Sequence, residues 1–477
     1  MIDWFDRFAL TTIEDSPNRH LEGILSDQPA LRSGGVSTLP DPSAPDDTGG
    51  GKEAGEVGGQ PLLELQVGAI AAGGGCVGRA PDGKVVFVRH SLPGEVVRAQ
   101  VTASTSSYLR ADAVEILTRS PDRVVAPCPH AGPGRCGGCD FQHVEIGAQR
   151  RLKAFRIAEQ LGRLAGIELG VEVEPVPGDA DGLGYRTRVR VAVDGRGAVG
   201  FRRHRSHRME YVRECPIASP AVSATGALEV LWPGATELEV VTGTDPAETM
   251  VSVTPRRRSG PRLPDLGRGV GVVVGGKVRR PPAAVRAVVG GRTYRISPGV
   301  FWQVHAGAAT ALLSAVLDLA GPCEGAAVAD LYAGAGLFSV PLAEAVGPSG
   351  SVLAVERDRR ACADARHNGA TFPNLRVLEG DVTPALVDSA LGRPDIVVLD
   401  PAREGAGTEV MRALADHAAG VRTLIYVSCD PASFGRDMRV LVDAGWRVTG
   451  LRAFDIFPMT EHVELVAGLE PTARAGS

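Results

Sequence analysis

Short apolar runs alternate with helix-like stretches over the last third of this chain. The runs are Ala327–Leu331, Val352–Val355, Leu375–Leu378, Ile396–Leu399 and Leu424–Val427. Their length and near-continuous apolar character are typical of strands buried on both faces of a sheet. Consecutive parallel strands need a crossover connection, which is usually a helix, and the intervening stretches can supply it. The sequence therefore predicts an α/β domain built on a doubly wound, mostly parallel sheet.

A cysteine stands just after the last of these strands. Cys429 ends an apolar β-branched run and is followed by Asp430-Pro431. Two other strand ends carry motifs, the glycine loop Asp330–Gly336 and the segment Asp400–Gly405. In open α/β sheets, ligands and catalytic groups collect at the carboxyl ends of the strands. A lone cysteine is most often a small buried hydrophobe, but a thiol beside a cofactor loop and a strand-end acid predicts covalent catalysis with a group-transfer cofactor.

The glycine loop identifies the kind of cofactor. Gly334 and Gly336 let the backbone approach a ligand closely. Glu356 ends the next strand, where an acid can bind ribose hydroxyls, and Asp381 follows the third strand. The third glycine of a dinucleotide fingerprint is missing, since Leu337 follows Gly336, and this argues against NAD. Together these residues predict a site for S-adenosylmethionine.

Four cysteines upstream of this region offer soft thiolate ligands for a metal. They are Cys128, Cys136, Cys139 and Cys215. Tetrahedral zinc and a [4Fe–4S] cluster are both possible with such a set. A zinc ribbon normally has two Cys-x-x-Cys knuckles, whereas Cys215 is solitary and lies 76 residues beyond Cys139. This spacing, with Gly137-Gly138 allowing a tight backbone, favours iron–sulfur over zinc.

The stretch before the cysteines predicts a small β-barrel. Four short strand-like runs, with glycine-rich turns between them, are Leu63–Val67, Val85–Val88, Glu95–Val101 and Ala111–Leu117. About five strands in so few residues are typical of an OB-type barrel, a common platform for nucleic acids. A plain barrel without a ligand fits the spacing equally well. After the first three cysteines, an apolar stripe predicts a helix over residues 144–164.

The charge distribution points to nucleic acid. Residues 1–60 hold eleven acidic and four basic residues, and 26–60 are rich in Gly, Pro, Ser and Asp, which predicts a disordered acidic tail. Residues 185–213 hold nine arginines, no lysine and interleaved aromatics. Such clusters are usually solvated surface, but this composition favours phosphate and base contacts. No apolar stretch approaches the ~20 residues of a membrane helix, and the first 25 residues lack a secretory pattern, so we expect a cytoplasmic protein with no membrane partner.

Three further side chains bear on which reaction the site can carry out. Glu464 precedes the apolar run Leu465–Ala467, which predicts a partly buried carboxylate with a raised pKa, suited to proton abstraction. His462 is a weaker candidate, more suited to a structural or RNA-facing role. Arg403 stands where amino-group methyltransferases often carry an aromatic residue, and this argues against methylation of an amino group.

In the order of its motifs, the chain resembles the RNA uracil-C5 methyltransferases, specifically the iron–sulfur type that modifies 23S ribosomal RNA. The resemblance runs from about Leu62 to Leu469. Its most specific segments are Asp400-Pro401-Ala402-Arg403, Ser428-Cys429-Asp430-Pro431 and Phe457–Glu464. The resemblance implies a class I methyltransferase domain with a Rossmann-like doubly wound sheet. It also implies an N-terminal OB-like TRAM β-barrel and a central iron–sulfur and RNA-binding domain.

The resemblance also implies a role for each candidate residue. Cys429 would be the nucleophile and Glu464 the general base, and we expect the start of the helix after Pro431 to favour the Cys429 thiolate. The implied substrate contacts are Asp400, Phe301, Arg186 and Arg188. The implied S-adenosylmethionine contacts are Gln303, Tyr332, Gly334, Gly336, Glu356, Asp381 and Asp400. The implied [4Fe–4S] ligands are Cys128, Cys136, Cys139 and Cys215.

These expectations divide the chain into five parts. They are an acidic tail (1–60), the barrel (61–119), the central domain (120–290), the methyltransferase domain (291–470) and a short tail (471–477). We expect a monomer that acts on 23S ribosomal RNA. Transfer RNA is the alternative substrate, and a non-catalytic RNA-binding factor on a methyltransferase scaffold is the alternative class of function.

Overall fold

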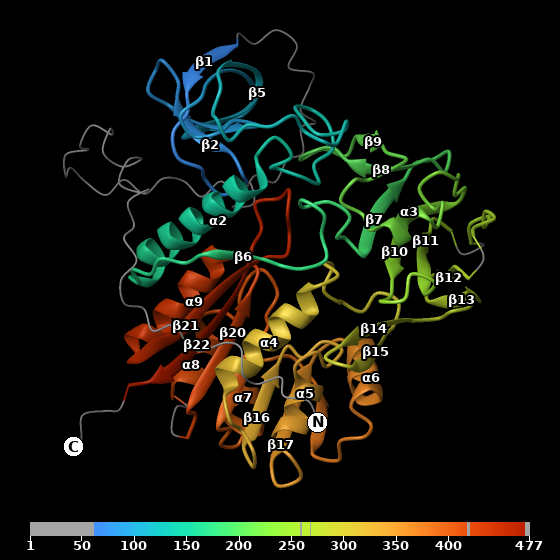
Figure 1. The fold of residues 1–477 in the computed structure, drawn as a ribbon, viewed down its shortest axis with the longest axis vertical. Coiled ribbons are helices and arrows are strands. Elements are labelled where there is room, and N and C mark those ends of the chain that lie inside the picture. Colours follow the sequence, from blue (N-terminus) through green and yellow to red (C-terminus); the bar gives the residue numbers. More distant parts are fainter. Residues whose placement is uncertain (1–61, 258–259, 268, 417–419, 473–477) are drawn as a thin grey trace. The chain divides into compact units, whose positions relative to one another are not determined.

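The computed structural model describes residues 62–257, 260–267, 269–416 and 420–472 (Figure 1). The predicted acidic tail (1–60) lies outside the described residues. The strands of the described residues form four sheets, which have five, seven, two and eight strands. The eight-stranded sheet is the largest, and it positions most of the candidate site residues.

The eight-stranded sheet has a parallel half and an antiparallel extension. Its order is β18-β17-β16-β19-β20-β22-β21-β6. The strands are β6 (Val173–Pro175), β16 (Ala327–Leu331), β17 (Ser351–Glu356), β18 (Leu375–Glu379), β19 (Ile396–Leu399), β20 (Thr423–Ser428), β21 (Trp446–Asp455) and β22 (Glu464–Pro471). The first five in the order pair in parallel, while β22 is antiparallel to β20 and to β21. All five strands predicted from the apolar runs are confirmed.

Helices cover both faces of this sheet. They are α4 (Ala308–Ala320), α5 (Ser339–Ala345), α6 (Arg359–Asn368), α7 (Pro384–Ala390), α8 (Thr408–Asp416) and α9 (Pro431–Asp443). Alternate residues of one strand enter different cores: Val328 of β16 packs with Leu312 of α4, whereas Leu331 packs in the core that contains Met438 of α9. Side chains of a strand alternate between its faces, so the sheet is buried on both sides, as a doubly wound fold requires.

The helix predicted over 144–164 is confirmed as α2 (Ile146–Gln160), which continues into a π-helical turn, η1 (Leu161–Ala165). The Glu145 carboxylate caps its first turn by accepting the backbone N–H groups of Gly147 and Ala148. Ile157 and Leu161 are buried in the same core as α9, although Phe155 of the predicted apolar stripe is 46% exposed. Strand β6 pairs with β21. Residues before the methyltransferase region thus complete its sheet and one of its cores.

The seven-stranded sheet contains the arginine-rich segment. Its order is β13-β12-β11-β10-β7-β8-β9. The strands are β7 (Arg188–Val193), β8 (Val199–Arg202), β9 (Met209–Tyr211), β10 (Ala235–Thr242), β11 (Thr249–Pro255), β12 (Gly271–Val274) and β13 (Lys277–Arg280). The short helix α3 (Pro220–Ser223) and the buried Trp232 pack in its core. The hairpin β14 (Val285–Val289) and β15 (Arg292–Ile296) packs instead in the core that contains α4.

The N-terminal sheet has five strands in the order β1-β4-β5-β3-β2. They are β1 (Leu63–Gln66), β2 (Cys76–Arg79), β3 (Val85–Arg89), β4 (Val96–Ser104) and β5 (Tyr108–Thr118). The four predicted runs correspond to β1, β3, β4 and β5. The N–H of Gly68 donates to the carbonyl of Val77 at 2.8 Å, which links the end of β1 to β2 at the other end of the order. Among the described helices, none is both long and apolar enough to cross a membrane.

Candidate active site

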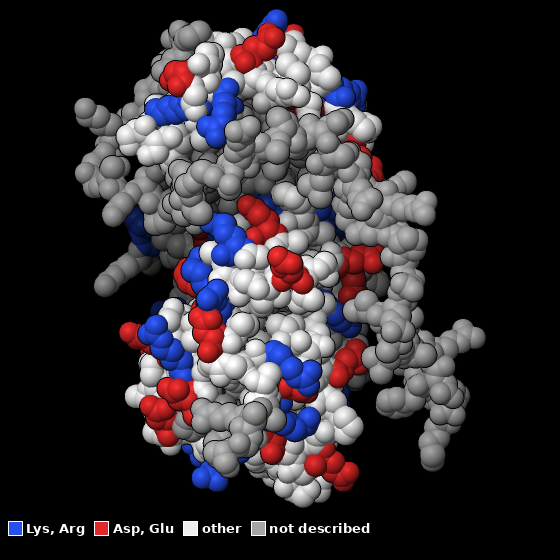
Figure 2. Space-filling view, turned by 90° about the vertical axis from the view of Figure 1, so that its left-hand side faces the viewer, with Lys and Arg blue, Asp and Glu red and all other residues white. Residues whose placement is uncertain are grey.

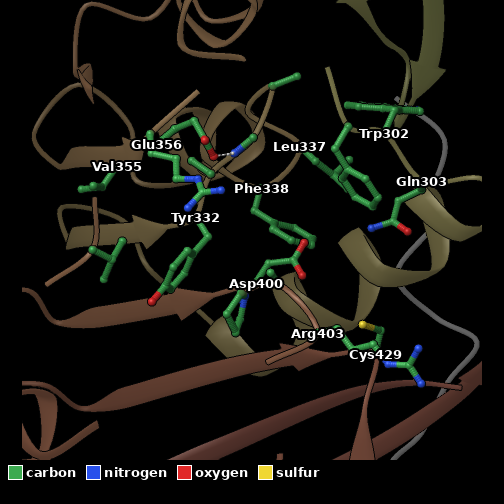
Figure 3. A pocket seen from close by; sticks show the side chains of 18 of the residues that line it. Trp302, Gln303, Tyr332, Leu337, Phe338, Val355, Glu356, Asp400, Arg403 and Cys429 are labelled. Carbon is green, nitrogen blue, oxygen red and sulfur yellow. Dashed lines mark hydrogen bonds between the residues drawn. The ribbon is translucent and has the colours of Figure 1, made fainter. Parts of the chain in front are cut away.

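A cavity of about 850 Å³ lies at the carboxyl ends of the parallel strands (Figure 3). It is called the catalytic cavity below. It brings together nine of the residues predicted to bind cofactor or substrate or to act in catalysis: Phe301, Gln303, Tyr332, Gly334, Glu356, Asp381, Asp400, Cys429 and Glu464. The lining residues that were not assigned a site role from the sequence include Trp302, Leu337, Phe338, Pro401, Arg403 and Phe457. The position of Arg403 and Phe457 inside specific motifs was the signal that could have assigned them.

The glycine loop after β16 turns sharply beneath this cavity. Tyr332 (φ 64°), Gly334 (φ 55°) and Gly336 (φ 88°) all adopt left-handed backbone conformations. Gly336 does not line the cavity, and a Cβ there would lie 3.3 Å from Val340 of α5. The absence of a side chain at Gly336 therefore lets α5 begin close to the loop. Tyr332, which does line the cavity, is a non-glycine residue held in this strained region.

Glu356, at the end of β17, braces the glycine loop. Its Oε2 accepts the N–H of Gly334 at 2.9 Å (Figure 3), and its Oε1 accepts the N–H of Asp358 at 2.6 Å. A carboxylate oxygen has more than one acceptor site. Glu356 can therefore hold the loop and still accept hydrogen bonds from a ligand's hydroxyl groups inside the cavity.

Three buried carboxyl groups raise one another's pKa in or beside the site. Burial, with a smaller contribution from the charge of Glu356, raises the pKa of Asp330 to about 7, although a hydrogen bond donated by Ser339 lowers it. Burial, with the charge of Asp330, raises the pKa of Asp400 to about 7. Burial raises the pKa of Glu464 well above its ordinary range, and Asp400 adds to this. A group of this kind binds a proton readily, which suits the predicted role of Glu464 as a base.

Cys429 follows β20 and faces the same cavity (Figure 3). Burial raises the pKa of its thiol to about 12, and the carboxyl groups of Glu464, Asp400 and Asp430 raise it as well. The expected stabilisation of the Cys429 thiolate by the start of α9 does not outweigh these effects on the pKa. The Asp430 side chain caps α9 by accepting the N–H groups of Ala432 and Ser433, so an acidic group stands where the helix would otherwise favour an anion. The protein's own groups therefore hold Cys429 as a neutral thiol at neutral pH.

Arg403 is the cation that opposes this effect. Its charge lowers the pKa of Cys429, and the two side chains lie near each other in the cavity (Figure 3). The guanidinium is 53% exposed and lies 3.8 Å from Asp430 and 4.0 Å from Glu461. Ser433 donates to the backbone carbonyl of Arg403 at 2.8 Å, which anchors the loop that carries it to α9.

The four predicted metal ligands meet at a second cavity of about 340 Å³, called the cysteine cavity below. Cys128, Cys136, Cys139 and Cys215 all line it. Among the described residues, no group of three or more His, Cys, Asp or Glu side chains is arranged to hold a single metal ion. Phe457 lines both cavities, so the segment before Glu464 lies between the two sites.

The two arginines predicted to bind substrate have different surroundings. Arg186 lines the cysteine cavity, and its Nε donates to the carbonyl of Arg188 at 3.0 Å. Arg188 lines neither cavity. Its guanidinium donates to the carbonyl of Val300 at 2.6 Å and to the Glu239 carboxylate at 3.0 Å. These partners give Arg188 a structural role in joining β7 to the segment before Phe301.

The glycine loop, the strand-end acids and Cys429 at the carboxyl edge of this doubly wound sheet fit an S-adenosylmethionine-dependent methyltransferase. Comparisons with known proteins support this class of protein. The model of the TRAM domain matches residues 63–114, which span most of the N-terminal sheet. The fold resembles that of a Pyrococcus abyssi tRNA (uracil-54, C5)-methyltransferase in complex with S-adenosyl-L-homocysteine, with a TM-score of 0.64 over 85% of this chain and 99% of that chain, at 23% identity.

Two relatives resemble the chain over nearly their whole length. An uncharacterized RNA methyltransferase of Streptomyces avermitilis is 47% identical over 430 residues, covering 86% of this chain and 98% of the relative. A 23S rRNA (uracil(1939)-C(5))-methyltransferase of Halomonas elongata is 32% identical over 484 residues, covering 94% and 97%. The chain belongs to the RNA uracil-C5 methyltransferase family.

Proposed function

We propose that this protein transfers a methyl group from S-adenosylmethionine to C5 of a uridine in 23S ribosomal RNA through a covalent adduct of Cys429. The observation that carries the proposal is that Cys429, Asp400 and Glu464 line one cavity together with the cofactor loop. The named Halomonas relative supports ribosomal RNA as the substrate. The likeness to the transfer RNA enzyme supports the fold alone.

Uracil C5 is too weak a nucleophile to take a methyl group unaided. S-adenosylmethionine supplies an electrophilic methyl group on a positive sulfonium. In the proposed reaction Cys429 loses its thiol proton to solvent, its sulfur forms a bond to C6, and the C5–C6 π electrons move into an enolate. The enolate C5 would then take the methyl group as the bond from that group to the sulfonium sulfur breaks, which leaves S-adenosylhomocysteine. The positive charge of Arg403, and that of a bound sulfonium, favour the thiolate that the surrounding carboxyl groups oppose.

The second half of the reaction needs a base. After methylation, C5 carries both the methyl group and its original hydrogen. Glu464 removes that proton, the C5–C6 double bond re-forms, and the Cys429 thiolate leaves C6. The pKa of Glu464 is raised by burial and by Asp400, which makes its carboxylate a better proton acceptor than an exposed glutamate. Asp400 lines the same cavity, and the proposal gives it a hydrogen bond to the uracil ring.

The target uridine must leave its base stack to reach Cys429. Phe301 is 65% exposed at the cavity wall, where its ring can stack against a flipped base. We propose that the TRAM-matched sheet, as an OB-like barrel, and the arginine-rich sheet hold the surrounding RNA. On the face drawn in Figure 2, the described acidic and basic side chains are interspersed.

We propose that the four cysteines that line the cysteine cavity hold a [4Fe–4S] cluster. What supports this is that four soft thiolate ligands, the number that such a cluster takes, surround one cavity. Zinc, which thiolates also bind, is the alternative. The proposed reaction needs no electron transfer, so we propose a structural role for the cluster. Anaerobic purification followed by iron and acid-labile sulfide analysis tests whether the cluster is present. Stoichiometric zinc without sulfide would contradict its presence.

The substrate is tested by methyl transfer. Anaerobically purified protein is given methyl-labelled S-adenosylmethionine with unmodified 23S ribosomal RNA or with unmodified transfer RNA. The proposal predicts label in 5-methyluridine from the ribosomal RNA. Label in transfer RNA alone would replace the substrate, and no label in either, with cofactor still bound, would favour a non-catalytic RNA-binding factor. Cytoplasmic location and a monomeric state stay predictions.

A further inference from the structure

An exposed tyrosine lies at the edge of the seven-stranded sheet. Tyr211 belongs to β9, the last strand in the order of that sheet, and is 57% exposed. It pairs with Gly200 of β8, which pairs in turn with Ala192 of β7. The two residues beside Tyr211 across the sheet are therefore the smallest side chains available. They leave the surface next to the tyrosine open.

The ring of Tyr211 is held across this surface. Its hydroxyl donates to Oδ2 of Asp194, just beyond the end of β7, at 3.1 Å. Asp194 is itself fixed, because its Oδ1 accepts the N–H groups of Arg196 and Ala198 at 2.8 Å each. A side chain that starts on β9 and reaches the β7–β8 turn must cross β8. One face of the ring is thus turned toward the sheet, and the other is left to the solvent.

An open groove of about 330 Å³ adjoins the ring. Its walls are Pro129, His130, Tyr211, Arg213, Glu214 and Pro216. It shares only His130 and Pro216 with the cysteine cavity and no residue with the catalytic cavity. Arg213 is the arginine among these walls, and Glu214 is the acidic residue. Three further exposed arginines, Arg196, Arg202 and Arg208, lie on β8 or on the turns that flank it in the same sheet. The groove therefore combines a restrained aromatic face with a cationic side chain.

We propose that this groove binds an unpaired base of the substrate RNA, stacked on Tyr211, with neighbouring arginines contacting the phosphates. A rigid exposed aromatic ring flanked by arginine is the arrangement with which proteins hold single-stranded nucleic acid. The inference rests on the proposed function, because it assumes that the substrate is RNA. It adds a second anchoring point for that RNA, outside the catalytic cavity.

The test compares Tyr211→Ala, Tyr211→Phe and Arg213→Ala with a matched control, Phe155→Ala. Phe155 is also an exposed aromatic residue, on α2. Binding of unmodified 23S ribosomal RNA transcript is measured at several salt concentrations, together with binding of S-adenosylmethionine and kcat at saturating RNA. Stacking on one aromatic side chain strengthens binding by roughly five- to a hundredfold.

Tyr211→Ala is expected to weaken RNA binding within that range without changing cofactor affinity, kcat or the salt dependence. Tyr211→Phe should stay within about threefold of the wild type, because the ring remains. Arg213→Ala should lower the slope of log K against log salt by ~0.7, as expected for one lost phosphate contact. Wild-type affinity in Tyr211→Ala, or an equal loss in Tyr211→Phe or Phe155→Ala, would overturn the inference. If the wild type itself fails to methylate RNA, the proposed function fails instead.

Discussion

The backbone N–H of Met459 donates to the side-chain oxygen of Gln149 at 2.8 Å, although 310 residues separate the two in sequence. Gln149 is fully buried on α2, and its amide group donates in turn to the carbonyls of Phe141 and Val144. The carbonyl of Met459 accepts the N–H of Phe141 at 2.9 Å. Met459 has a φ of 65°, so these bonds hold a left-handed turn in the segment that leads to Glu464.

This turn predicts a difference between two substitutions at one position. Met459→Ala and Met459→Gly both remove the buried side chain, but only glycine adopts a positive φ without strain. We expect Met459→Gly to retain about 1 kcal/mol more stability than Met459→Ala, and a higher kcat, because Glu464 stays better placed. Denaturant unfolding and steady-state kinetics of the two proteins measure this. Equal stability and equal kcat would show that the turn does not depend on the strained residue.

The neutral thiol predicts how fast Cys429 reacts with an alkylating agent. With a pKa raised to about 12 by burial and neighbouring carboxyl groups, very little thiolate is present at pH 8. Alkylation of the Cys429 peptide by iodoacetamide, followed by mass spectrometry, should be slow at pH 8 and still rising above pH 9. Arg403→Ala should slow it further, because that arginine lowers the pKa. A plateau in the rate below pH 8 would contradict this account of the site.

The raised pKa of Asp330 predicts that the stability of the fold depends on pH. Burial raises its pKa to about 7 in the folded protein, above its ordinary value near 3.8. A carboxyl group with a raised folded pKa favours the folded state when protonated, so stability falls as pH rises from about 4 to about 7. We expect Asp330→Asn to be more stable than the wild type at pH 8, by up to ~4 kcal/mol, and this gain to shrink below pH 5. Unfolding measured at both pH values would disprove this if the gain stayed constant.

Substitutions of Glu464 and of Cys429 are expected to block different steps of the same reaction. Glu464→Gln lacks the base, so the methyl group can be transferred while release of the product stalls. We expect its kcat to fall by ~10²- to 10⁴-fold, with protein covalently bound to methylated RNA accumulating on denaturing gels. Cys429→Ala should show no turnover and no adduct, yet bind S-adenosylmethionine as the wild type does. Normal turnover in either variant would remove that residue from the mechanism.

Much of the sheet could be predicted because its strands are short, apolar and buried on both faces. Ile396–Leu399 and Ala327–Leu331 have the predicted bounds. The three-residue strand Val173–Pro175 carries no comparable pattern, and its place depends on pairing with a strand about 280 residues later. The residues predicted at the strand ends also line one cavity, because the carboxyl ends of parallel strands share one edge.

The electrostatics of the site could not be predicted in the same way. The pKa of the Cys429 thiol is raised by burial first and then by the charges of Glu464, Asp400 and Asp430. The pairing of Arg188 with Glu239, 51 residues away, is likewise not visible in the arginine-rich segment itself, and an RNA contact of Arg188 stays a prediction. Such pairings depend on the tertiary fold, which local sequence patterns do not specify.

The covalent adduct of Cys429 is the central claim, and RNA that carries 5-fluorouridine at the target position tests it most directly. Fluorine at C5 replaces the proton that Glu464 must remove, so the reaction should stop after methyl transfer with Cys429 still bonded to C6. Incubation with S-adenosylmethionine should give a denaturation-resistant protein–RNA complex whose cross-linked peptide contains Cys429. Methylation of ordinary RNA by the same preparation, with no adduct to the fluorinated RNA, would contradict the mechanism.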